Sequence, residues 1–308
     1  MNASFELALD AARAAAGMQH YPEAALYIVA TPIGNLADIS LRALHVLQLV
    51  DAIACEDKRH SQPLLRQYGI DKPLLAAHQH NEVEAAGGIV QRLQRGERVA
   101  YISDAGTPAV SDPGARLVAA VRAAGFKVMP LPGASSVTTV LSAAGVTRAA
   151  GDGNGSGFVF AGFLPSKAGE RDQAIALLQA DARPVVILEA PHRIEALARA
   201  MAVLQGRLVT VGRELTKQFE EIATMPAHDF AGWLAAGQQR TRGEFALVLH
   251  ASSEQKEPDN GLRVLQLLLA ELPTKTAVKL AADITGEPRN ALYEMALRIK
   301  GEASTEDA

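Results

Sequence analysis

Short apolar runs, rich in β-branched residues, alternate with segments of helical periodicity along most of the chain. In the first half, such runs predict strands at residues 26–30, 52–56, 98–103 and 127–131. Between them, apolar positions recur at helical spacing, namely Leu41, Leu44, Val46, Leu47 and Leu49, and later Leu117, Val118 and Val121. This alternation is typical of βαβ units and a mostly parallel sheet. We therefore expect one α/β domain over residues 25–150.

A second block of the same character follows a glycine-rich segment. Residues 151–157 read GDGNGSG, which is typical of a linker or an exposed loop. Beyond it, strands are predicted at residues 158–162, 184–189, 208–213 and 244–250, and one helical face carries Ile194, Leu197, Ala198, Met201 and Leu204. We expect a second α/β domain over residues 151–253, stacked on the first.

The C-terminal segment, residues 254–308, has only helical patterns. Leu262, Val264, Leu265 and Leu268 predict one helix, and Thr274 is a candidate cap for a second helix. Gly286 and Pro288 predict a sharp stop and restart. The pattern resembles a helix-turn-helix, in which Arg289 and Asn290 would present nucleic-acid contacts. A plain helical cap is an equally compatible interpretation.

Composition and charge narrow the class of protein. The 308 residues include 30 basic and 34 acidic side chains, a formal net charge of −4, so any RNA or DNA partner must be held locally. A single cysteine, Cys55, excludes an internal disulfide and a multi-cysteine zinc site. No run approaches the roughly 18 apolar residues of a membrane span. Residues 1–24 contain Glu6 and Asp10, unlike a secretory signal. We expect a poorly ordered leader or loose helix there, and a cytoplasmic protein with no membrane contact.

Polar and turn-forming residues follow nearly every predicted strand. Because ligands of open α/β sheets bind beyond the carboxyl ends of the strands, we expect these loops to converge on one cleft. None has the spaced glycines and lysine of a phosphate-binding loop, which disfavours kinases. Accessible backbone and small hydroxyls suit a neutral or cationic ligand with amide, ribose and adenine edges.

The order of the motifs makes a family resemblance specific. The chain contains, in this order, the strings LYIVATPIGNLADIS, EDKRHS, YISDAGTPAVSDPG, PLPGASS, FAGFLPSK, EAPHRI and GRELTKQFEE, and the match spans roughly residues 26–250. Together they resemble the bacterial 16S ribosomal RNA cytidine 2′-O-methyltransferase family of the tetrapyrrole-methylase superfamily, whose extra C-terminal domain the last segment also resembles. This chain has Lys58 where that family usually has threonine.

The resemblance implies a homodimer in which two stacked α/β domains of tetrapyrrole-methylase type hold S-adenosyl-L-methionine between them, with a small helix-turn-helix-like appendage. On the cofactor side it implies Pro32, Asp104, Gly106, Thr107, Ser135, Ser136 and Leu164. Methyl transfer from a sulfonium depends on alignment and exclusion of water, so we predict no metal site.

A ribose hydroxyl needs a base to become a good nucleophile. Our hypothesis is that Glu189 or Asp57 accepts or orients the proton, with Glu214 and Lys217 as further candidates for catalysis. RNA would be held by Lys217 and by Arg59, Arg193, Arg213, Arg289 and Asn290. Two plain alternatives stay open. Residues 56–59 have the pattern of a solvated ion-pair face, and Arg213 and Glu214 could simply pair with each other.

The remaining chemically active side chains receive structural interpretations. His60, His78 and His80 have no metal-like spacing, and we expect surface or supporting roles for them. For His192, at a helix start, we favour a structural role. Cys55 lies in an apolar run and is expected to be a small buried hydrophobe. Trp233 is expected to be a packing anchor.

The expected function is S-adenosylmethionine-dependent 2′-O-methylation of a cytidine in the decoding centre of 16S ribosomal RNA. Because the net charge is negative, we expect recognition of the assembled small ribosomal subunit rather than of naked RNA. Since fold does not fix function, two alternatives remain. One is a methyltransferase for a tetrapyrrole-like small molecule. The other is a non-catalytic nucleic-acid-binding ligand sensor.

Overall fold

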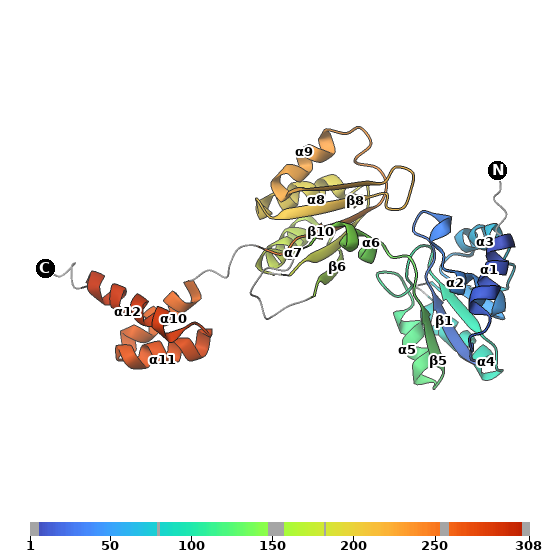
Figure 1. Ribbon diagram of the computed structural model, residues 1–308, viewed down its shortest axis with the longest axis horizontal. Coiled ribbons are helices and arrows are strands. Elements are labelled where there is room, and N and C mark those ends of the chain that lie inside the picture. The colour runs from blue at the N-terminus through green and yellow to red at the C-terminus, as the bar shows by residue number, and fades with distance from the viewer. Residues whose placement is uncertain (1–5, 79–80, 147–156, 182, 253–258, 304–308) are drawn as a thin grey trace. The chain divides into compact units, whose positions relative to one another are not determined.

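The chain forms two compact units, residues 1–251 and residues 252–308. The computed structural model describes residues 6–78, 81–146, 157–181, 183–252 and 259–303 (Figure 1). The first unit contains two five-stranded sheets, and the second is helical. Residues 151–156 of the predicted linker lie outside the described residues, as does His80.

The first sheet is entirely parallel, with strand order β3-β2-β4-β1-β5. Its strands are β1 (Ala25–Val29), β2 (Ala52–Cys55), β3 (Leu74–Ala76), β4 (Val99–Ile102) and β5 (Lys127–Leu131). One face is covered by α1 (Glu6–Ala16), η1 (Leu36–Asp38), α2 (Leu41–Leu49) and α3 (Lys58–Gln67), and the other by α4 (Glu82–Gln94) and α5 (Ala115–Ala123). Because both faces are covered, the central strands are continuously apolar. The four predicted strands are confirmed, and β3 is an addition.

The N-terminal segment is packed against the first sheet's helices. Leu9 and Ala12 of α1 are buried in the same cluster as Leu44 and Leu47 of α2. This corrects our expectation of a poorly ordered leader or loose helix for residues 6–16. The apolar positions of α1 are mostly alanines, which give a weak hydrophobic pattern but allow two helices to approach closely.

The second sheet has strand order β6-β7-β10-β8-β9. Its strands are β6 (Val159–Phe163), β7 (Val185–Glu189), β8 (Leu208–Arg213), β9 (Glu221–Pro226) and β10 (Phe245–Leu249). Only β6 and β7 pair in parallel, whereas β10 is antiparallel to β7 and β8, and β9 is antiparallel to β8. The prediction of a mostly parallel sheet is therefore wrong for this layer. One face carries α7 (Ala168–Ala180), α8 (Ile194–Met201), η2 (Ala202–Leu204), η3 (Ala227–Asp229) and α9 (Phe230–Ala235).

Helix α6 (Ser136–Ala143) covers the other face of the second sheet. Its Val137 and Val140 pack with Val186 and Val248, and Ile33 from the first layer packs against the same cluster. The chain therefore leaves the first layer at residues 132–135, and the helix that follows packs on the second sheet. The boundary between the layers lies before residue 150, where it was predicted. The loop after β5 consequently joins the two layers.

The second unit is a three-helix cluster of α10 (Asp259–Glu271), α11 (Thr274–Thr285) and α12 (Arg289–Ala303). Gly286 ends α11 with a left-handed φ of 73° and donates to the carbonyl of Ala282, so the predicted stop and restart is confirmed. Thr274 is the first helical residue rather than the cap, because Pro273 occupies the cap position. Within the described chain, no helix is long and apolar enough to cross a membrane.

Candidate active site

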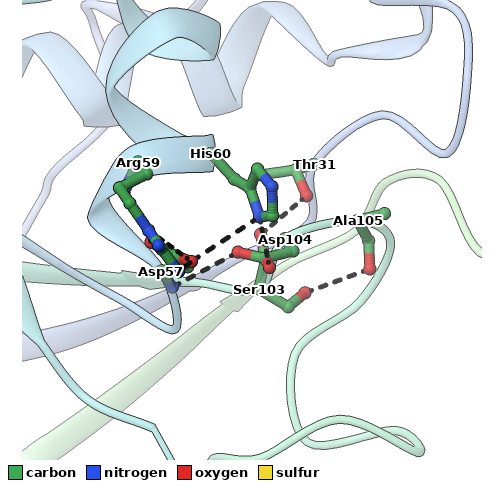
Figure 2. Close-up of polar contacts among 7 residues, drawn as sticks. All are labelled: Thr31, Asp57, Arg59, His60, Ser103, Asp104 and Ala105. Carbon is green, nitrogen blue, oxygen red and sulfur yellow. Dashed lines mark hydrogen bonds and ion pairs between the residues drawn. The ribbon is translucent and has the colours of Figure 1, made fainter.

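The loops that follow β1, β4 and β5 are fastened to one another. Thr31 and Gly106 exchange two backbone hydrogen bonds of 2.9 Å, and the Thr31 hydroxyl donates to the Ser103 carbonyl at 3.1 Å (Figure 2). The Thr107 hydroxyl donates to the Ala134 carbonyl at 3.1 Å. Since parallel strands end at the same edge, these links make three separate loops into one platform.

The loop between β4 and α5 has an unusual backbone. Ala109 and Ser111 adopt left-handed φ values of 66° and 72°, which cost about 1–3 kcal/mol each for residues with a side chain. The loop is anchored at its far end, where the Gly114 N–H donates to the buried Glu82 carboxylate at 2.5 Å. The strain is thus maintained by surrounding contacts, as is common where backbone faces a ligand.

Between these loops and the second sheet lies a cavity of about 310 Å³, which we call the interlayer pocket. It is lined by Ile33, residues 105–107, 110–112 and 135–137, Phe163, residues 188–191, Leu215 and residues 244–246. This size is at the lower end of the range of roughly 300–1,000 Å³ found for small-molecule sites. The expected convergence of strand-end loops from both layers is therefore observed.

The predicted cofactor residues divide into two groups. Gly106, Thr107, Ser135 and Ser136 line the interlayer pocket. The other three do not line it. Pro32 and Leu164 are buried and are sequence neighbours of lining residues, and Asp104 lines a different cavity. Four of the seven predicted cofactor residues therefore line one pocket, and their role in binding a cofactor stays a prediction.

The charge of the interlayer pocket is one-sided. Its lining contains the carboxylates of Asp112, Glu189 and Glu244, and within the described chain it contains no lysine, arginine or histidine. Burial raises the pKa of Asp112, against the effect of a hydrogen bond with Ser103. Two of these carboxylates have cationic partners outside the lining, Glu189 with Arg193 and Glu244 with Lys217. A lining with acceptors and no cation of its own still suits a positively charged ligand better than an anion. The sulfonium of S-adenosylmethionine fits this requirement, whereas a polyphosphate does not.

Glu189 ends β7 and is buried, with 2% of its surface exposed. Its Oε1 accepts from the Ala190 N–H at 2.8 Å and lies 3.0 Å from Arg193 Nε, while Arg193 also donates to the Leu164 carbonyl. Its Oε2 is enclosed and has no hydrogen-bond partner within the described chain. Leaving a buried acceptor without a donor lowers the stability of the fold by about 1–3 kcal/mol. We therefore expect a bound ligand to donate a hydrogen bond to this oxygen. Arg193, predicted to contact RNA, instead holds Glu189.

A second cavity opens beside the ends of β2, β3 and β4. We call it the β2–β4 cavity, and its lining comprises Glu56, Asp57, Lys58, Arg59, Ala76, His78 and Asp104. The Asp57 carboxylate accepts from the Arg59 N–H at 2.8 Å and from its guanidinium at 2.7 Å (Figure 2). These hydrogen bonds lower the pKa of Asp57 to about 2, which makes it a weak base. Asp57 and Arg59 therefore form an ion pair, as the alternative interpretation of residues 56–59 predicts.

His60 contacts two carboxylates, those of Asp104 and Asp57, which line the β2–β4 cavity. Its Nδ1 is 3.1 Å from Asp104 Oδ2 and 3.9 Å from Asp57 Oδ2 (Figure 2). The Asp57 N–H approaches Asp104 Oδ1 at 3.4 Å. These contacts join residues that follow two neighbouring strands, and the side chain of His60 is 72% exposed.

The remaining predicted residues lie at the rim or inside the fold. Lys217 Nζ bonds Glu214 at 2.9 Å and Glu244 at 3.0 Å, and although burial disfavours its charge, these hydrogen bonds raise its pKa. Arg213 is buried and donates to the carbonyls of Arg242 and Phe219 at 2.7 and 3.2 Å. This corrects the expectation that Arg213 holds RNA. It also does not pair with Glu214.

Sequence reasoning missed some residues of the interlayer pocket. Asp112 lies within a family motif and Glu244 begins a predicted strand, but neither was predicted as a site residue. Both line the pocket. The structural interpretations of two other residues are confirmed. Cys55 is buried, which raises its pKa, and Trp233 packs against the second core with the Arg240 guanidinium 4.3 Å from its ring centroid.

Comparison with known proteins defines the class first. The sequence pattern of the family "Tetrapyrrole (Corrin/Porphyrin) Methylases" matches residues 25–231. Among solved structures, the cobalt precorrin-4 methyltransferase CbiF aligns with a TM-score of 0.54 at 17% identity, over 73% of this chain and 94% of that chain. Diphthine synthase aligns with a TM-score of 0.53 at 15% identity, over 73% and 90%. The fold is that of a tetrapyrrole methylase.

More similar relatives define the family within that class. A Pseudomonas aeruginosa protein is 46% identical over 285 residues, which cover 90% of this chain and 98% of the relative. An Escherichia coli O157:H7 protein is 45% identical over 280 residues, covering 90% and 96%. Both are named ribosomal RNA small subunit methyltransferase I, and the pattern "RsmI C-terminal HTH domain" matches residues 254–300. The chain therefore belongs to this family of methyltransferases, which confirms the resemblance and the predicted fold class.

Proposed function

We propose that this chain transfers the methyl group of S-adenosylmethionine to the ribose 2′-hydroxyl of a cytidine in the decoding centre of 16S ribosomal RNA. The observation that carries the proposal is the 45–46% identity, over about 90% of the chain, to relatives named for the small ribosomal subunit RNA. The one-sided charge of the interlayer pocket supports the choice of a cationic methyl donor.

The interlayer pocket is the proposed site of the donor. When bound, S-adenosylmethionine supplies an electrophilic methyl carbon on a cationic sulfur. Gly106 and Thr107 present backbone along one wall, Ser135 and Ser136 line another, and Glu189 Oε2 offers an acceptor to an N–H or O–H of the donor. Apolar side chains of both layers exclude water, which favours displacement at the methyl carbon. They are Ile33, Leu188 and Leu215.

The proposed RNA contacts lie on both units. In the first unit, Lys58 and Arg59 project at the β2–β4 cavity, and the Arg59 side chain is 89% exposed. In the second unit, Arg289 and Asn290 are exposed in the first turn of α12, with Arg289 paired to Asp283 at 3.0 Å. Because such exposed pairs are weak, a phosphate can replace the aspartate. We propose that the protein acts as a homodimer in the cytoplasm on the assembled small subunit.

Isolated small ribosomal subunits and S-adenosylmethionine labelled in its methyl group test this proposal. After incubation, the RNA is digested to nucleosides and the labelled product is identified by mass spectrometry. The proposal predicts 2′-O-methylcytidine, formed faster with subunits than with naked 16S RNA. Label in a base would contradict the ribose assignment, label in a small molecule would favour tetrapyrrole-like chemistry, and no transfer would favour a ligand sensor.

The role of the helical unit is tested by replacing its exposed pair. The double variant Arg289→Ala, Asn290→Ala should raise KM for small subunits several-fold while kcat is unchanged, because it removes binding contacts remote from the chemistry. Lys279→Ala, an exposed cation on α11, is the matched control and should leave KM unchanged. An unchanged KM in the double variant would assign these residues no part in RNA binding.

A further inference from the structure

Consecutive residues of one turn line the two cavities. Asp104 lines the β2–β4 cavity, and the next residue, Ala105, lines the interlayer pocket. The Ser103 hydroxyl donates to the Ala105 carbonyl at 3.2 Å, which fixes the turn between them (Figure 2). A group held in one cavity is therefore close to a group held in the other. Direct transfer between two bound molecules requires this kind of adjacency.

The β2–β4 cavity has the mixed chemistry that a nucleotide needs. Lys58 can neutralise a phosphate, as can Arg59 where the phosphate replaces Asp57 as its partner, and the carboxylates of Glu56 and Asp104 can accept from hydroxyl or amino groups. The interlayer pocket has only carboxylates among its charged lining residues within the described chain, so it would repel a phosphate. The acceptor nucleotide therefore belongs in the β2–β4 cavity, given that the donor occupies the other.

Neither Asp57 nor Glu189, the two carboxylates predicted as bases, is suited to take a proton from that nucleotide. The Asp57 carboxylate is committed to Arg59. Glu189 lines the interlayer pocket, where its Oε2 is available to the donor, and it does not line the β2–β4 cavity. His60 differs from both, because its Nδ1 is held at 3.1 Å by Asp104 while its Nε2 has no hydrogen bond to any described residue. A carboxylate bound to Nδ1–H fixes the tautomer that leaves Nε2 as an acceptor.

We propose that His60 is the catalytic base of this reaction and that Asp104 is its positioning residue. This inference rests on the proposed function. The O–H bond of the ribose 2′-hydroxyl breaks and its proton passes to His60 Nε2. The oxygen forms a bond to the methyl carbon as the carbon–sulfur bond breaks, and sulfur keeps that electron pair and becomes a neutral thioether. The resulting imidazolium is stabilised by Asp104 and Asp57 and then loses its proton to water.

The charged groups around His60 determine how the activity responds to pH. Asp104 faces it from the end of β4, and Asp57 faces it from the end of β2. Lys58 and Arg59 lie on its own helix, and Glu56 and His78 line the β2–β4 cavity beside its two carboxylate partners. Because only a neutral imidazole can accept the proton, kcat should be lost at a pH low enough to protonate His60.

The test is the single-turnover rate of the full chain, saturated with S-adenosylmethionine and small subunits. His60→Ala should lower this rate by about 10²–10⁴-fold, the usual contribution of a general base, while the affinities for donor and subunit stay within twofold of wild type. His60→Gln, which cannot accept the proton, should be equally slow. Added imidazole should restore part of the rate to His60→Ala and none to Glu189→Gln.

Two further variants separate catalysis from structure. His228→Ala is the matched control, because His228 is also exposed and lies 3.5 Å from a carboxylate, that of Asp229, and it should react as fast as wild type. Asp104→Asn should slow the reaction and should not respond to imidazole. The inference is overturned if His60→Ala retains a third or more of the rate, or if its defect is in subunit KM alone without rescue. Failure of the proposed function would be seen separately, as wild-type label outside the ribose.

Discussion

The interlayer pocket and the β2–β4 cavity use carboxylates in opposite ways. In the interlayer pocket, Glu189 is buried, held by Arg193 on one oxygen and without a partner on the other. In the β2–β4 cavity, Asp57 is bound on the surface by the exposed Arg59, and Asp104 serves a neighbouring imidazole. Burial and the position of the countercharge, rather than residue type, therefore decide which carboxylate remains available to a ligand.

The largest stability effect should come from the ion pair of the interlayer pocket. Arg193→Met removes the countercharge of a buried carboxylate and a bond to the Leu164 carbonyl, and we expect a loss of about 2–3 kcal/mol in the free energy of unfolding. Arg183→Met is the matched control, because its pair with Asp181 is exposed and should contribute less than about 1 kcal/mol. Equal losses in urea unfolding would remove the distinction between the two kinds of pair.

A smaller effect is expected at the rim of the interlayer pocket. Burial opposes ionisation of Glu214, but hydrogen bonds from Lys217 and the Glu244 backbone outweigh it and lower the pKa of Glu214. Because the pKa of Glu214 is lower in the folded than in the unfolded protein, its ionised form stabilises the fold at pH values above the unfolded pKa of about 4.3. This stabilisation is lost as the pH falls through the folded pKa. Lys217→Met should therefore cost about 0.5–1 kcal/mol at pH 7.

That cost should shrink at a pH low enough to protonate Glu214 in the wild type as well, which lies below the ordinary glutamate range because its pKa is lowered. Urea unfolding at a series of pH values measures the difference between variant and wild type. A difference that is the same at pH 7 and at pH 3 would show that packing of the Lys217 side chain, not its charge, stabilises the rim.

The smallest effect concerns the exposed pair of the β2–β4 cavity. Carboxyl NMR should show Asp57 titrating with a pKa of about 2, because Arg59 stabilises its ionised form. In Arg59→Ala the midpoint should rise towards the ordinary value of about 3.9. The pair therefore persists at all pH values above its titration. A wild-type midpoint near 4 would show that Arg59 does not stabilise the Asp57 carboxylate, so that no ion pair has to break when Arg59 binds RNA.

Much of the fold was predictable because its signals are local. The apolar runs of β1, β2, β4 and β5 are continuous, since helices cover both faces of the first sheet. The second sheet was predicted less well, because β9, at a sheet edge, consists mostly of exposed and partly buried residues and gives no apolar run. Strand direction in that sheet depends on the hairpin between β8 and β9, whose loop at residues 214–220 carries no simple turn signature.

The site was predictable where it consists of backbone and small residues near strand ends. Gly106, Thr107, Ser135 and Ser136 were identified through the motifs and line the pocket. The contact of His60 with Asp104 was not foreseen, since it spans 44 residues and arises from the lateral pairing of β2 with β4. Strand order is set by long-range packing and leaves no mark in the sequence near either residue.

The central claim is that the interlayer pocket holds the methyl donor and the β2–β4 cavity does not. Calorimetric titration of S-adenosylmethionine into wild type, Glu189→Gln and His60→Ala tests it most directly. The account predicts saturable binding to wild type and His60→Ala with the same Kd. Glu189→Gln should bind about 10–100-fold more weakly, because it loses a hydrogen bond to a charged acceptor. No heat with wild type, or an unchanged Kd in Glu189→Gln, would contradict the account.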